Sequence, residues 1–183
     1  MKAHKILTLS TLLVAASGPA LADKTAGEMV DDSWIQSEVK AKLVGEDMSE
    51  GLGVNLETRK GVVQLGGFTD DVEKSKQLAK LAASVEGVKK VDNQMHPKRG
   101  DRSAGQAIDD GVATTRVKSA ITSADFGDGV AINVDTYNGV VLLTGFADTS
   151  ASKQRAGELA AADKNVDDVI NGIYVMDLSL IHI

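Results

Sequence analysis

The sequence predicts an α+β protein of two tandem αββαβ domains, each a three-stranded mixed sheet with two helices on one face. Three observations lead to this prediction. The stretch GVVQLGGFTD at 61–70 returns as GVVLLTGFAD at 139–148, about 78 residues later, which indicates an internal repeat. In each copy, helically spaced apolar residues lie on either side of a segment that alternates as a strand does. A stretch rich in glycine and charge, PKRGDRSAGQAIDD, separates the two copies.

The repeat sets the expected domain boundaries. We expect a first domain over 31–96, a linker over 97–109 and a second domain over 110–177. A short N-terminal linker over 23–30 precedes the first domain. Residues 178–183, LSLIHI, read as translated sequencing adapter, so we set them and His182 aside from functional reasoning.

Residues 1–22 read as a secretory signal peptide. MKAHKILTLSTLLVAASGPALA has a basic start, an apolar run too short to span a bilayer, and a small-x-small cleavage site at 20–22. The predicted location is therefore the periplasm, after secretion across the inner membrane, with no transmembrane segment in the mature chain.

The first helix and the hairpin come first in each copy. Ile35, Val39 and Leu43 share one helical face, and their counterparts are Ala113, Val117 and Ile121. A strand then alternates over 54–59, and its hairpin turn falls at Lys60-Gly61. The second copy has Asn138-Gly139 there, which is typical of a type I′ turn.

The second helix and the last strand complete each copy. We expect the helix over 71–84, with Gly87 ending it in the first copy and Asn165 in the second. The last strand is expected over 88–95 and again over 166–176.

A corner between strand and second helix recurs in both copies. Strand, glycines and helix is also the order of a phosphate loop, but neither copy contains GxGxxG or GxxxxGK[ST]. We therefore expect structural roles: a glycine that lets the chain leave the strand close under the helix, a Phe that plugs the core, and an Asp that caps the helix. Glu73 would complete a capping box in the first copy. The motif residues are Gly61, Gly67, Phe68, Asp70, Gly139, Gly145, Phe146 and Asp148.

At these residues the chain resembles the BON domain family. The resemblance rests on GVVQLGGFTD with LAASVEGVKKVDNQM, and on GVVLLTGFAD with VDDVINGIYV, and covers about 31–96 and 110–176. It implies an αββαβ fold, a periplasmic location and no known catalysis. It also implies contact with phospholipid or envelope proteins under stress.

Composition and motifs argue against catalysis and against nucleic acid. The chain has no cysteine, a net charge of −6 and only 3% aromatic residues, which disfavours a thiol nucleophile, phosphate-backbone binding and base stacking. His96 is the one histidine left once the leader and the tail are set aside. A single histidine near the end of a strand is more often solvated than catalytic. No metal motif is present. We therefore expect a protein that is not an enzyme and needs no cofactor.

Lysines of the first copy form the candidate lipid contact. Anionic lipid attracts such clusters, although an ordinary solvated helix face is the favoured explanation, and the acidic second copy would be repelled. The residues are Lys74, Lys76, Lys80, Lys89 and Lys90.

An apolar sheet face in the second copy forms the candidate interface. Two helices can cover only one face of a sheet, and the other face is unusually apolar in this copy. The favoured occupant is the first domain; the alternatives are a membrane protein, an unfolded client or a second copy of the chain. The residues are Val140, Leu142, Ile170, Tyr174 and Met176.

The sequence thus predicts a non-enzymatic periplasmic envelope-stress protein that binds phospholipid or envelope-protein surfaces. The alternative is a chaperone-like holder of unfolded periplasmic or outer-membrane proteins. The oligomeric state stays open.

Overall fold

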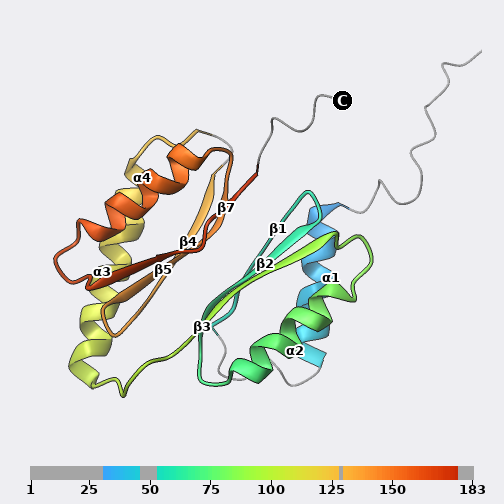
Figure 1. Cartoon of the computed structure of the whole chain (residues 1–183), viewed down its shortest axis with the longest axis horizontal. Coiled ribbons are helices and arrows are strands. Elements are labelled where there is room, and N and C mark those ends of the chain that lie inside the picture. Colours follow the sequence, from blue (N-terminus) through green and yellow to red (C-terminus); the bar gives the residue numbers. More distant parts are fainter. Residues whose placement is uncertain (1–30, 46–52, 128–129, 177–183) are drawn as a thin grey trace, which may run out of the picture.

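The structure, a computed structural model, describes residues 31–45, 53–127 and 130–176. Two domains follow each other along the chain and pack sheet against sheet, with their helices on the outside (Figure 1). Each sheet therefore has one face on its own helices and the other on the partner domain. The predicted signal peptide, the N-terminal linker and the 178–183 tail lie outside the described residues.

The first domain has the order α-β-β-α-β. Strand β1 pairs antiparallel with β2, and β2 pairs parallel with β3. The elements are α1 (Asp32–Gly45), β1 (Asn55–Arg59), β2 (Val62–Thr69), α2 (Val72–Ala83) and β3 (Lys90–Pro97).

The second domain repeats this order, with its last strand in two pieces. Strand β4 pairs antiparallel with β5, and both β6 and β7 pair parallel with β5. The elements are α3 (Ala104–Ser123), β4 (Ala131–Tyr137), β5 (Val140–Ala147), α4 (Ser150–Ala161), β6 (Asp168–Asn171) and β7 (Tyr174–Val175). The predicted fold class, two tandem αββαβ domains, is confirmed.

The hairpin turns have the backbone that the sequence predicts. Lys60 and Gly61 have φ of 50° and 77°, and Asn138 and Gly139 have 47° and 74°. Positive φ at both central residues defines the type I′ turn, whose twist matches that of the flanking strands.

Each domain has its own core between sheet and helices. Ile35, Val39 and Leu43 pack in the first core. Their counterparts Val117 and Ile121 pack in the second, and Ala113 is also buried. The predicted helix stripes are confirmed.

The predicted helix caps are wrong by one residue. Strand β2 runs on to Thr69, so the cap of α2 is Asp71, whose carboxylate accepts from the Lys74 amide at 2.9 Å. Thr149 caps α4 in the same way, through the Ser152 amide. Asp70 and Asp148 are thereby free for ion pairs. Glu73 closes no capping box and pairs instead with Lys76 at 2.7 Å.

The predicted helix ends also shift. Helix α2 ends at a right-handed cap, Ser84, and the left-handed Gly87 lies in the turn beyond it. Helix α4 ends likewise at Ala162, and Asn165 does not have positive φ.

The connection between the domains is shorter than the predicted 97–109 linker. Ser103 and Gln106 form a capping box, so α3 already begins at Ala104. Only 98–103 lies outside regular structure.

Candidate functional site

The apolar face of the second sheet lies against the sheet of the first domain. Along β5, Val141 and Leu143 point to the helices, whereas Leu142 and Thr144 point to the other domain. Leu142 is 0% exposed and Thr144 1% exposed. Of the other predicted interface residues, Val140, Ile170, Tyr174 and Met176 are half-buried.

Gln64 of β2 inserts its carboxamide into the sheet of the second domain. Its Nε2 donates to the Gly172 carbonyl at 2.8 Å, and its Oε1 accepts from the Gly145 amide. In a parallel ladder these two backbone groups would bond each other. The side chain thus replaces one ladder bond with two, and the predicted last strand over 166–176 is interrupted between β6 and β7.

The interface has an approximate two-fold symmetry that follows the repeat. Asn55 donates to Asp135, and Asn133 donates to Glu57 at 3.1 Å. Asn55 and Asn133 are equivalent positions of the two copies, as are Glu57 and Asp135. Each copy therefore makes the same contact to the other, as the subunits of a two-fold symmetric dimer do.

Close to the symmetry axis, equivalent positions of the two copies carry side chains of different size. A Cβ at Gly66 would lie 2.6 Å from the Thr144 methyl carbon, and one at Gly172 would lie 2.8 Å from Gln94 Oε1. Gly66 is equivalent to Thr144, and Gln94 to Gly172. At both places a large residue of one copy meets the glycine of the other.

The two motif phenylalanines line the interface rather than the helix-side cores. Phe68 and Phe146 lie on the outer pleat of β2 and β5, because β2 and β5 place their odd-numbered residues toward the helices. The Phe68 ring lies 5.7 Å from that of Tyr137, and the Phe146 ring lies 5.8 Å from that of Tyr174. The prediction that each Phe plugs its own core is wrong.

The motif glycines lie inside strands rather than at a corner under the helix. Gly67 has φ of 141° and Gly145 has 112°. A Cβ on Gly67 would collide with the Gly53 carbonyl, and one on Gly145 with that of Ala131. The close neighbour that requires glycine is thus the start of the first hairpin strand.

The motif aspartates form ion pairs. Asp148 pairs with Arg59 of the other domain at 2.7 Å, with both side chains mostly buried. Asp70 pairs with Lys98, also at 2.7 Å. Sequence reasoning missed the Arg59 contact because its partners come from different copies.

A second recurring aspartate holds each hairpin turn. Asp110 of α3 is 3% exposed and accepts from the amides of Asn138 and Gly139, each at 2.9 Å. Asp32 of α1 accepts likewise from the amides of Lys60 and Gly61. The recurrence of these aspartates about 78 positions apart was a usable signal in the sequence.

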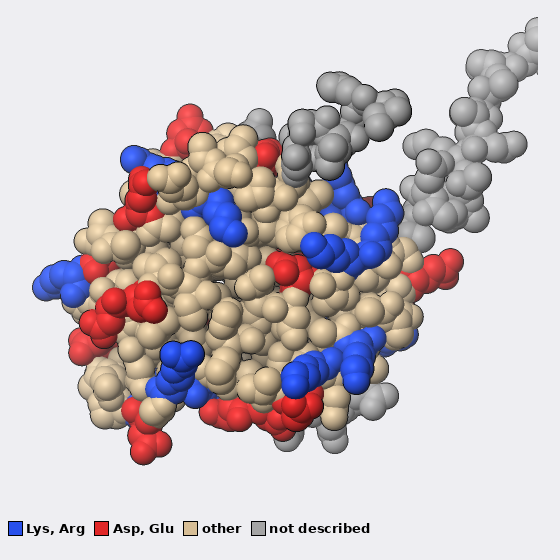
Figure 2. Space-filling model, viewed as in Figure 1, with Lys and Arg blue, Asp and Glu red and all other residues tan. Residues whose placement is uncertain are grey.

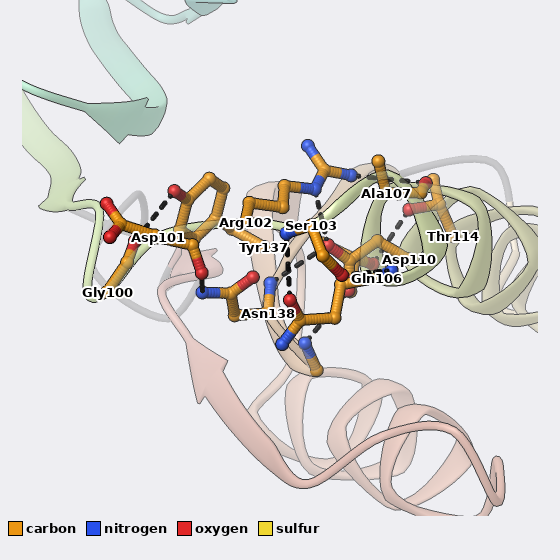
Figure 3. Close-up of polar contacts among 12 residues, drawn as sticks. Gly100, Asp101, Arg102, Ser103, Gln106, Ala107, Asp110, Thr114, Tyr137 and Asn138 are labelled. Carbon is orange, nitrogen blue, oxygen red and sulfur yellow. Dashed lines mark hydrogen bonds and ion pairs between the residues drawn. The ribbon is translucent and has the colours of Figure 1, made fainter.

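The inter-domain segment is fixed to this turn of the second domain (Figure 3). Arg102 Nε lies 2.8 Å from the Asp110 carboxylate. The Tyr137 hydroxyl donates to the Gly100 carbonyl, and Asn138 Nδ2 donates to the carbonyls of Arg99 and Asp101. The short connection is therefore held in place along much of its length.

Two titratable groups near the interface have shifted pKa values. Burial raises the pKa of the Asp135 carboxyl, while Lys118 and the hydrogen bond from Asn55 oppose the shift. Burial, and then the charge of Arg99, lowers the pKa of His96. Among the described residues, no cluster of three or more His, Asp or Glu side chains could hold a metal ion.

The predicted lipid-contact lysines lie on the first domain. Lys76 pairs with Glu73, and Lys90 donates to the Tyr174 hydroxyl at 3.2 Å. Lys74, Lys80 and Lys89 form no ion pair among the described residues. On the face seen in Figure 2, basic side chains lie over both halves; their larger groups are on the right-hand half, which the first domain forms, and those on the left stand among acidic side chains. No described helix is long and apolar enough to cross a bilayer.

Comparison with known proteins finds the BON domain twice. The family model matches residues 31–98 and 109–177. The osmotically-inducible protein Y of Escherichia coli strain K12 is 31% identical over 148 residues, which is 80% of this chain and 74% of that protein. A 21 kDa hemolysin of Actinobacillus pleuropneumoniae is 40% identical over 73 residues, 39% of this chain and 38% of that protein.

Among solved structures, the chain matches CdsD, a structural protein of the type III secretion system of Chlamydia trachomatis. The match has a TM-score of 0.34 at 12% identity and covers 79% of this chain and 94% of that one. A likeness of this size carries no argument about function.

Proposed function

The chain belongs to the BON domain family, and from that premise we propose that it is a non-enzymatic periplasmic protein of the envelope-stress response that binds anionic phospholipid surfaces. The name of its relative, an osmotically inducible protein, supports osmotic stress as the inducing condition.

The observation that carries the proposal is the burial of both sheet faces. Because Leu142 and Gln64 are shielded between the domains, a partner must bind the helices, the strand edges or the loops. On that outer surface the first domain offers Lys74, Lys80 and Lys89, which form no ion pair with any described residue. Each well-placed Lys is worth about 1 kcal/mol toward anionic lipid.

The charge difference between the domains supports a preferred orientation. Residues 31–99 carry about 11 basic and 12 acidic side chains, against about 5 and 11 for 109–177. The first domain would therefore face the membrane and the second would point away from it.

An exposed aromatic residue adds an apolar contribution on the first domain. Trp34 of α1 is the chain's single tryptophan and is 43% exposed. Tryptophan favours the membrane–water interface because its ring is amphipathic. The equivalent residue of the second domain, Val112, is also an exposed apolar side chain.

Vesicle flotation tests the proposal directly. The mature chain should float with vesicles that contain phosphatidylglycerol at low salt, lose that binding at high salt, and shift its Trp34 emission to the blue when bound. The Lys80→Gln/Lys89→Gln variant should bind several-fold more weakly. Arg155→Gln/Lys164→Gln removes two exposed cations from the second domain and should bind as the parent does. Absence of flotation at low salt, or equal loss in both variants, would overturn the proposal.

A chaperone-like function is the second candidate. Ile108 and Val112 are one helical turn apart on α3 and 68% and 37% exposed, so they offer an apolar site for an unfolded client. Suppression of client aggregation that is lost in Ile108→Ser/Val112→Ser, in a protein that does not float with vesicles, would favour this function.

A further inference from the structure

A cavity lies between the domains at the end of the interface nearest the connecting segment. Its volume is about 380 Å³, and its wall combines Phe68, His96 and Arg99 of the first domain with Tyr137, Asp168 and Ile170 of the second. Ligand pockets in proteins run from about 300 to 1,000 Å³, so the size suits a small molecule rather than a polymer.

The cavity lies where the two-fold symmetry of the interface breaks down. At the opposite end, Tyr174 occupies the position equivalent to His96, packs on Phe146 and accepts a hydrogen bond from Lys90. Lys90 is itself the counterpart of Asp168. At the cavity end the smaller His96 stands opposite the acidic Asp168, and no hydrogen bond joins these two described residues.

The mouth of the cavity carries two opposite charges that do not neutralise each other. Arg99 and Asp168 are both exposed, and neither forms an ion pair among the described residues. The imidazole of His96 adds no second cation at neutral pH, because burial and Arg99 lower its pKa. One cation and one anion therefore remain available to a ligand.

The rest of the wall is apolar, with two polar atoms left unsatisfied. Phe68, Val140 and Ile170 supply apolar surface. His96 Nε2 and Asn138 Oδ1 are buried and lack a hydrogen-bond partner among the described residues. Because Asn138 Nδ2 already donates to two carbonyls, Oδ1 is the free acceptor of that amide. Buried atoms of this kind are uncommon and often mark a place where a ligand or water completes the bonding.

We propose that this cavity binds a small zwitterion with apolar side chains, of the size of an apolar dipeptide. The carboxylate of the ligand pairs with Arg99, and its ammonium group pairs with Asp168. The side chains pack on Phe68 and Ile170, and an N–H group of the ligand donates to Asn138 Oδ1 after a small side-chain adjustment.

Calorimetric titration of the full mature chain with the dipeptide Leu-Leu tests the proposal. We expect a Kd below about 1 mM, with at least a tenfold loss when either the amino end is acetylated or the carboxyl end is amidated. His96→Tyr installs the residue of the other end, fills the cavity and should abolish binding while the thermal midpoint is unchanged or higher. Asp168→Asn should remove the preference for a free amino end, whereas Asp167→Asn, its exposed neighbour, should not.

Three results of the dipeptide titrations would overturn the proposal, and a fourth would come from a comparison probe. The three are no binding of Leu-Leu at millimolar concentration, binding that ignores both end groups, and undiminished binding by a folded His96→Tyr protein. Phosphoethanolamine serves as the comparison probe, because a lipid head group carries the same pair of charges. Tighter binding of that probe would assign the cavity to lipid head groups and reject the dipeptide.

Discussion

At the scale of single residues, Gln64 has the clearest effect on how the domains hold together. Its carboxamide bonds the buried backbone of Gly145 and Gly172 and also reaches Asp92 at 2.7 Å. A carboxamide has the same donor and acceptor as a peptide group, which is why it can take a place in a ladder.

Replacing Gln64 with Leu, the residue at the equivalent position of the second copy, should destabilise the protein. The backbone groups of Gly145 and Gly172 would lose their partners, at an expected loss of about 2–4 kcal/mol in the free energy of unfolding. Urea denaturation measures this loss, and hydrogen exchange should show faster exchange of the Gly145 amide. Gln77→Leu, on the exposed face of α2, is the matched control and should change little. Unchanged protection of Gly145 would contradict the assigned role.

Asp135 makes the stability of the interface depend on pH. Since burial raises its pKa in the folded state, folding favours the protonated carboxyl. Its ionisation therefore destabilises the folded protein. This destabilisation begins as pH rises above the pKa of Asp135 in the unfolded chain and is complete above its pKa in the folded protein.

Asp135→Asn should accordingly be more stable than the parent at pH 7, because the amide still accepts from Asn55 and carries no charge. The difference in the free energy of unfolding should shrink as pH falls toward the ordinary Asp value of 3.8. Urea denaturation at several pH values measures it, with the exposed Asp125→Asn as the control. A difference that stayed constant with pH would show that ionisation of Asp135 is not its cause.

At the scale of elements, β2 and β5 pack through unequal residues at their closest approach. Gly66 accommodates Thr144, and a Thr at both positions would place two side chains in the space of one. Glycine at both positions would leave a void there instead. Packing of the first copy against the second is thus favoured over packing of two identical copies.

The reciprocal exchange of these two residues tests this relation. Gly66→Thr alone should cost about 1–3 kcal/mol through overpacking, and Thr144→Gly alone should leave a void. The double variant should recover most of the loss, with a coupling energy of at least about 1 kcal/mol in a double-mutant cycle followed by urea denaturation. Strictly additive effects would mean that the two residues do not share one space.

Elements governed by local rules were predictable from the sequence. The stripe of Ile35, Val39 and Leu43 follows from helical periodicity, and the turn at Asn138-Gly139 follows from its need for positive φ. The cap of α2 was missed because Asp70 and Asp71 are equally good caps by composition, and only the end of β2 decides between them.

The candidate site was predictable only in part. The repeat and the apolar outer pleat around Leu142 pointed to a surface that needs a partner. Nothing near Gln64 in sequence marks its bond to Gly172, since that bond joins residues 108 positions apart. The cavity depends on the difference in size between His96 and its counterpart Tyr174. That difference points to a cavity only once the two-fold symmetry of the interface is known.

At the scale of the whole molecule, the two sheets form the inner layers and the helices form the two outer layers, so the helices carry most of the exposed surface. Residues 98–103 connect the domains and are bonded to the hairpin turn of the second domain. The membrane surface and the small-molecule cavity are proposed for different parts of this arrangement. Loss of one through substitution should leave the other intact, and the two functions can be assayed in the same protein.

The insertion of Gln64 also bears on how such a chain can change over generations. In a symmetric homodimer encoded by one gene, any substitution at the interface appears on both sides of the axis at once. In this chain the two sides have separate codons, so position 64 can carry Gln while its counterpart at 142 carries Leu. A duplicated gene can thus acquire a one-sided insertion, or a cavity at one end alone, that a single gene encoding identical subunits cannot specify.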